Sequence, residues 1–118
     1  MRRIALMILA LMLGSLPAVA DGARVIETKD GFSQLVAGRT LSTLGVRLQV
    51  AANGEISGRA FGRDVTGNWK WTDGYFCRNM TVGEQVFPLN CQQVVSDGDR
   101  VTFIADKGTG DQARLRIR

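Results

Sequence analysis

Residues 46–60 read VRLQVAANGEISGRA, and apolar and polar side chains alternate on both sides of Asn53-Gly54. An alternation of period two is typical of strands that bury one face. A two-residue turn at Asn53-Gly54 would mix the two faces, whereas a three-residue loop over residues 52–54 pairs Val50 with Ile56 and keeps the apolar side chains together. The stretch therefore predicts a β-hairpin with this longer loop.

The same pattern continues along the chain, which makes the expected fold mainly β. Turn signals at Asp73-Gly74, Asp97-Gly98 and residues 107–110 separate further alternating segments. Around Asp97-Gly98 neither strand register separates the apolar face from the polar one, so the sequence does not decide the pairing there. Seven or eight short antiparallel strands with tight turns predict a small meander that closes into a barrel or a sandwich. Three glycines lie where a strand would bend or its face would be crowded: Gly58, Gly62 and Gly67.

One short helix is expected before the strands. Thr28 or Asp30 can cap its start, Phe32, Leu35 and Val36 follow at helical spacing, and Gly38 can end it. The apolar stripe predicts that this helix packs on one end or one face of the sheet.

The two tryptophans belong to a second expected hairpin. If Thr72-Asp73-Gly74 forms the same three-residue loop, Trp69, Trp71, Tyr75 and Cys77 share one face. Lys70 and Arg78 then lie on the other face.

Residues 1–20 have the three parts of a secretory signal peptide. Arg2 and Arg3 are followed by the apolar run Ile4–Leu13, and Ala18-Val19-Ala20 is a small-residue cleavage site before Asp21. A membrane anchor is the alternative, but a spanning helix needs about 20 apolar residues. We expect cleavage after Ala20, a periplasmic or secreted location, no transmembrane segment after cleavage, and one domain over residues 21–118.

Cys77 and Cys91 are the two cysteines of the chain. An even number of cysteines in an exported protein predicts a disulfide. The alternative, a redox pair, usually has the C-x-x-C spacing at the start of a helix. The wider spacing here favours a structural bridge that stabilises a small domain.

The sequence lacks residues that several classes of enzyme need for catalysis. The chain has no histidine, which excludes a Ser-His-Asp triad, a Cys-His pair and an imidazole metal site. Residues 108–113 match G-x-G-x-x-A, but the alternating strand that follows predicts a hairpin turn, because a dinucleotide site needs a helix there. A hydrolase with two carboxylates stays an alternative, with candidates scattered among Glu27, Glu55, Asp64 and Glu84.

The aromatic residues Trp69, Trp71 and Tyr75, which Phe61 and Phe103 could extend, are the first candidate binding group. Two tryptophans on one strand face usually belong to a core. The alternative is the mouth of a barrel that holds an apolar or sugar-like ligand.

The arginines are the second candidate group. The first hairpin places Arg47 directly opposite Arg59, which is unfavourable unless an anion or a carboxylate lies between them. Arg114, Arg116 and Arg118 alternate along the last expected strand. These side chains indicate either a solvated face that protects an edge strand or a surface that attracts anions such as lipid phosphate or wall polymer. The net charge of +4 includes two arginines of the expected signal peptide, so nucleic acid is not an expected partner.

Five short motifs carry a resemblance to a group of short exported bacterial proteins. They are LVAGRTL (35–41), GNWKW (67–71), GYFCR (74–78), Asn90-Cys91 and residues 108–110. Automated naming often labels these proteins dihydrodipicolinate reductase. The enzyme family of that name is cytoplasmic and longer, and has a nucleotide domain and a histidine-bearing catalytic motif. Since no residue here matches that motif, no catalytic position carries over, and we interpret the label as a misnomer. The resemblance implies a shared fold.

The sequence therefore favours an exported, non-catalytic β-domain, with no cofactor or metal, that binds a ligand or an envelope macromolecule. An enzyme is the alternative, either the NADPH-dependent reductase of the label or a carboxylate hydrolase. A further alternative is a protein similar to the small exported lysozyme inhibitors, which are disulfide-bonded β-barrels.

Overall fold

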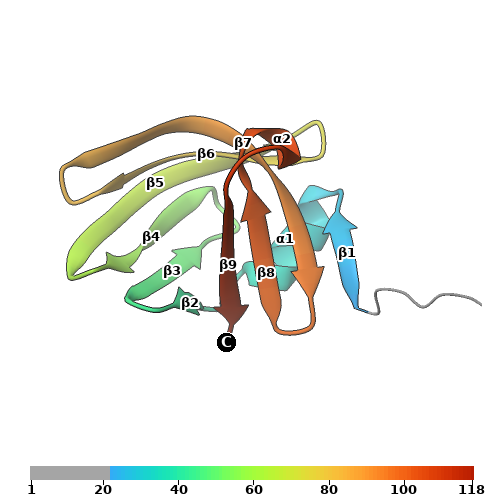
Figure 1. The fold of residues 1–118 in the computed structure, drawn as a ribbon, viewed down its shortest axis with the longest axis horizontal. Helices are drawn as coiled ribbons and strands as arrows, with labels where there is room; N and C mark the ends of the chain where they lie inside the picture. Colours follow the sequence, from blue (N-terminus) through green and yellow to red (C-terminus); the bar gives the residue numbers. More distant parts are fainter. Residues whose placement is uncertain (1–21) are drawn as a thin grey trace, which may run out of the picture.

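The computed structural model describes residues 22–118, so the expected signal peptide lies outside the described residues. Figure 1 shows a strongly curved sheet. Its strands are antiparallel, and two short helices accompany them. The elements in chain order are β1 (Ala23–Ile26), α1 (Lys29–Val36), β2 (Leu41–Thr43), β3 (Val46–Val50), β4 (Glu55–Ala60), β5 (Arg63–Thr72), β6 (Tyr75–Val82), β7 (Gln85–Asp97), β8 (Arg100–Ile104), α2 (Ala105–Gly108) and β9 (Gln112–Ile117).

The strands close into a barrel. Their order is β7-β6-β5-β4-β3-β2-β9-β8, and β8 pairs back onto β7, which makes an 8-stranded antiparallel barrel. β1 pairs with the last residues of β7, beyond the part of β7 that pairs with β6. The predicted mainly β class is confirmed, and of the two expected architectures the barrel is the one that forms.

Helix α1 packs against the interior of this barrel. The Thr28 side chain, one of the two expected caps, accepts a hydrogen bond of 3.0 Å from the Gly31 amide and so caps the helix. Phe32 is completely buried, and its ring contacts Trp69, Trp71 and Phe76 at centroid distances of 5.0–5.2 Å. The predicted helix is confirmed, and its aromatic anchor fills the centre of the core.

The first hairpin has the predicted register. Val50 lies opposite Ile56, and Arg47 lies opposite Arg59. Gly58 permits the close approach of the two strands, because a Cβ at this position would overlap the carbonyl oxygen of Arg47. The period-two pattern and the turn chemistry are therefore sufficient to fix this pair of strands.

The predicted register of the second hairpin is wrong. The turn has two residues, Asp73 and Gly74, whose φ angles of 54° and 87° are typical of a type I′ turn. Trp71 consequently lies opposite Phe76 instead of sharing its face with Tyr75 and Cys77. The shorter loop is favoured because Asp-Gly suits type I′ geometry and because Phe76, a fully apolar ring, then enters the core.

The two-residue turn also places Arg78 on the tryptophan face and not on the opposite face, which the sequence predicts for it. It lies opposite Trp69, and its guanidinium donates a hydrogen bond of 2.9 Å to the carbonyl oxygen of Pro88. Desolvation by burial lowers the pKa of this guanidinium.

The last part of the chain also differs from the expectation. Ala105 lies in the alternating segment between the turn signals at Asp97-Gly98 and residues 107–110, but it begins α2, a short helix in which Asp106 and Lys107 have positive φ angles of 55° and 57°. The G-x-G-x-x-A match over residues 108–113 begins at the last residue of α2 and ends within β9, so no helix follows it, as expected. The open register at Asp97-Gly98 resolves into a two-residue turn with Asp97 opposite Arg100.

Candidate functional site: an arginine groove on the barrel

The tryptophans named as candidates are part of the core. Trp69 is 4% exposed and donates its indole N–H to the carbonyl oxygen of Ala51 at 2.8 Å. The half-buried Trp71 stacks on Phe32 and donates to the carbonyl oxygen of Glu27 at 3.3 Å. Tyr75 lies on the other face of the hairpin, where the ammonium of Lys107 is 5.6 Å from its ring centroid.

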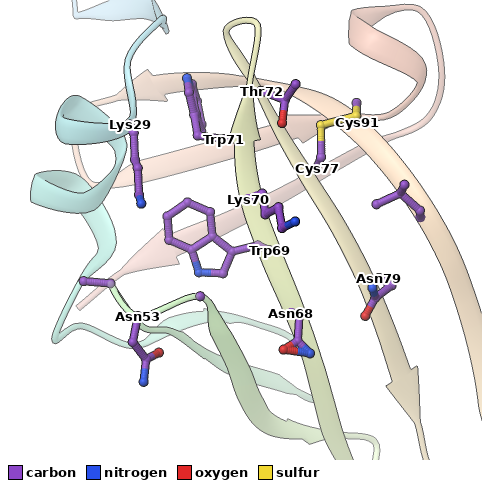
Figure 2. A pocket seen from close by; sticks show the side chains of 13 residues that line it. Lys29, Asn53, Asn68, Trp69, Lys70, Trp71, Thr72, Cys77, Asn79 and Cys91 are labelled. Carbon is purple, nitrogen blue, oxygen red and sulfur yellow. A yellow bond between two sulfur atoms is a disulfide. The ribbon is translucent and has the colours of Figure 1, made fainter.

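An open hollow of about 860 Å³ lies beside the tryptophans. Figure 2 shows Trp69 and Trp71 on one side of β5, and Lys70 and the disulfide on the other. Lys29 of α1 has its ammonium 5.9 Å from the Trp69 ring centroid. Because both indole N–H groups already donate to backbone carbonyls, the tryptophans offer this hollow apolar ring surface and no free hydrogen-bond donor.

The disulfide between Cys77 and Cys91 is present, as predicted. The two cysteines lie directly opposite each other on β6 and β7. Cys77 also lies opposite Lys70, which places the bridge on the face of the hairpin opposite Trp69 and Trp71. The bridge therefore joins two neighbouring strands on the outside of the barrel.

The arginines form a continuous row on the outer surface. In the register of four neighbouring strand pairs, Arg59 lies opposite Arg47, Arg47 opposite Ser42, Ser42 opposite Arg116, and Arg116 opposite Arg100. Directly opposite residues share a face, and their Cβ atoms are about 4.5–5.5 Å apart. The row therefore places Ser42 midway between two arginines, one on each neighbouring strand.

The short strand β2 forms the floor of a groove in this row. Ser42 and Thr43 line two shallow hollows of about 630 and 610 Å³ that meet along β2. We call the combined surface the arginine groove. Its basic side chains are Arg47, Arg59, Arg100, Arg114, Arg116 and Arg118.

Two carboxylates pair with arginines of the groove, Asp64 at one end of the row and Asp99 beside Arg116. Asp64 binds Arg59 at 2.6 Å, so a carboxylate does offset the opposed arginines Arg47 and Arg59. Asp99 accepts from Arg100 at 3.1 Å and from Arg116 at 3.3 Å. Among residues 22–118, no ion pair involves Arg47. Six arginines of the groove share these two carboxylates, and Arg47 beside Ser42 pairs with neither, so the groove has an excess of positive charge.

The groove joins arginines that the sequence presents as separate groups. Arg47 and Arg59 belong to the first hairpin, and Arg114, Arg116 and Arg118 lie at the end of the chain. Ser42 and Arg100 are not among the residues predicted from the sequence. No local signal identifies Ser42, because its place between arginines depends on the pairing of β2 with β9, which are far apart in the sequence.

Comparisons of the chain with family models, with curated proteins and with solved structures find no match. The resemblance to exported proteins labelled as reductases therefore stays a prediction.

None of the helices within residues 22–118 is long and apolar enough to span a bilayer.

Proposed function

We propose that this disulfide-bonded β-barrel is an exported, non-catalytic domain that binds a ligand carrying phosphate-like anions. The observation that carries the proposal is the placement of Ser42 directly between Arg47 and Arg116. Guanidinium groups bind phosphate and carboxylate oxygens with two parallel hydrogen bonds, and a serine hydroxyl can donate a third. An anion over Ser42 would also relieve the repulsion among the arginines of the groove.

The charges of the groove suit binding better than turnover. Its basic side chains are all arginines, which supply positive charge and hydrogen-bond donors but no acceptor. The chain contains no histidine, the side chain that most often carries protons in catalysis. These features support a binding domain.

Two features support a location outside the cytoplasm. The first twenty residues have the pattern of a cleavable signal peptide. The Cys77–Cys91 bridge belongs to a class of bond that persists in oxidising compartments. Lipid phosphates and wall polymers are the anionic ligands that such a protein would meet.

Calorimetric titration of the purified protein with inorganic pyrophosphate tests the proposal. Replacing Arg47 or Arg116 by Gln should weaken binding by about tenfold each, because each removes one charge-assisted contact. Raising the salt concentration should also weaken binding, since these charges are exposed and screened.

Arg24→Gln is the matched control, because it removes the same charge from an exposed position on β1. This variant should bind pyrophosphate as the wild type does. Equal weakening by Arg24→Gln and Arg47→Gln would show diffuse attraction and would refute a site at Ser42.

A further inference from the structure

Two large apolar side chains project from neighbouring turns at one end of the barrel. Leu44, in the β2–β3 turn, is 91% exposed, and Phe61, in the β4–β5 turn, is 74% exposed. The Phe61 amide donates to the carbonyl oxygen of Gly45 at 2.8 Å, so the two turns touch. Figure 1 shows these turns at the same end of the barrel as the β6–β7 turn.

Phe61 occupies a backbone conformation that its residue type disfavours. Phe61 and Gly62 have φ angles of 53° and 81°, which is type I′ geometry. Asn, Asp and Gly are the usual residues at the first position of such a turn, and the β5–β6 turn of this chain has Asp73 there with a φ of 54°. The Phe61 ring lies against Gly45 of the neighbouring turn but stays mostly exposed, so it adds little to the core. Bulky residues held at positive φ in this way often serve a function.

Positive charge surrounds the two apolar side chains. Arg47 is the second residue of β3, just after the turn that carries Leu44, and Arg59 is the second-last residue of β4, just before the Phe61 turn. The arginine groove therefore reaches this end of the barrel. Arg63 begins β5 directly after the Phe61 turn and is exposed. Two carboxylates lie at this end as well: Asp64, which binds Arg59, and Glu84 in the β6–β7 turn.

We propose that this end of the barrel docks on a bilayer that contains anionic lipid. Phe61 and Leu44 enter the interface between headgroups and acyl chains, while Arg47, Arg59 and Arg63 contact lipid phosphates. Exposed apolar side chains combined with basic ones are the two components that hold proteins on anionic membranes. A water-soluble polyanion would use the arginines but would gain nothing from Phe61 and Leu44. The inference rests on the proposed function and names lipid phosphate as the anion.

Co-sedimentation with phosphatidylcholine vesicles, with and without phosphatidylglycerol, tests this inference. The wild type should bind the vesicles that contain phosphatidylglycerol and should bind pure phosphatidylcholine at least about tenfold more weakly, because the arginines then lack anionic partners. Phe61→Asn should weaken binding to the anionic vesicles by about tenfold or more, and adding Leu44→Ser should weaken it further. Asn suits a type I′ turn, so Phe61→Asn should keep or raise the melting temperature.

Leu89→Ser is the matched control, because Leu89 is 66% exposed but lies on β7, away from the two turns. This variant should bind anionic vesicles as the wild type does. Equal weakening by Leu89→Ser and Phe61→Asn would overturn the inference.

Pyrophosphate titration of the same variants separates this inference from the proposed function. Phe61→Asn should leave pyrophosphate binding unchanged, because its ring lies outside the anion site. A wild-type protein that binds pyrophosphate but not anionic vesicles would refute membrane docking and leave the anion site standing. A protein that binds neither would refute both.

Discussion

At the residue scale, glycines decide how closely the strands of the barrel approach. A Cβ at Gly67 would overlap the carbonyl oxygen of Asn79 on the neighbouring strand, and a Cβ at Gly58 would overlap that of Arg47. Crowding or bending at both positions is predictable from the sequence, because a glycine within an alternating strand often marks a bulge, a bend or the close approach of another backbone. Only the structure identifies the atoms that would collide.

Gly67→Ala should therefore destabilise the protein by more than about 2 kcal/mol, because the backbone of two strands must separate. Gly38→Ala is the control: Gly38 has a φ of 76° but open space around its Cβ position. This change should cost only about 1–2 kcal/mol, which is the cost of the left-handed conformation alone. Urea unfolding of both variants gives the comparison, and equal losses would show that strand spacing tolerates a side chain at Gly67.

At the element scale, local chemistry predicts the helix and the first hairpin but not the second. The Thr28 cap and the spacing of Phe32 and Val36 lie within one helix, and the loop over residues 52–54 lies within one hairpin. In the second hairpin, Tyr75 and Phe76 are both aromatic, so alternation alone does not decide which ring enters the core. The preference of Asp73-Gly74 for a two-residue turn is the signal that could have decided it.

The disulfide between Cys77 and Cys91 links two elements, β6 and β7. In the chain-entropy model, closing the loop between Cys77 and Cys91 is worth ~3 kcal/mol. Replacing both cysteines by Ala should lower the melting temperature by roughly 10 °C or more in a domain of this size. Calorimetry with and without a reductant measures the effect. The double variant should show no further response to the reductant, and a wild type that melts unchanged when reduced would contradict a stabilising bridge.

At the scale of the whole molecule, closure of the barrel creates the arginine groove. Pairing of β2 with β9 brings Ser42 beside Arg116, and pairing of β8 with β9 adds Arg100. The sequence predicts the arginines of the first hairpin and of the last strand as two separate groups, because nothing local specifies which distant strands pair. The turns that carry Leu44 and Phe61 are brought together by the consecutive pairings of β2 with β3, β3 with β4, and β4 with β5.

The proposed site holds one anion over Ser42, between Arg47 and Arg116. The most direct measurement is an NMR titration of the ¹⁵N-labelled protein with inorganic pyrophosphate, followed through the backbone amides and the arginine Nε–H signals. Saturable shifts should concentrate on Ser42, Thr43, Arg47 and Arg116, and Arg47→Gln should remove them. Shifts that do not saturate, or that spread evenly over the arginines of the chain, would contradict a defined site.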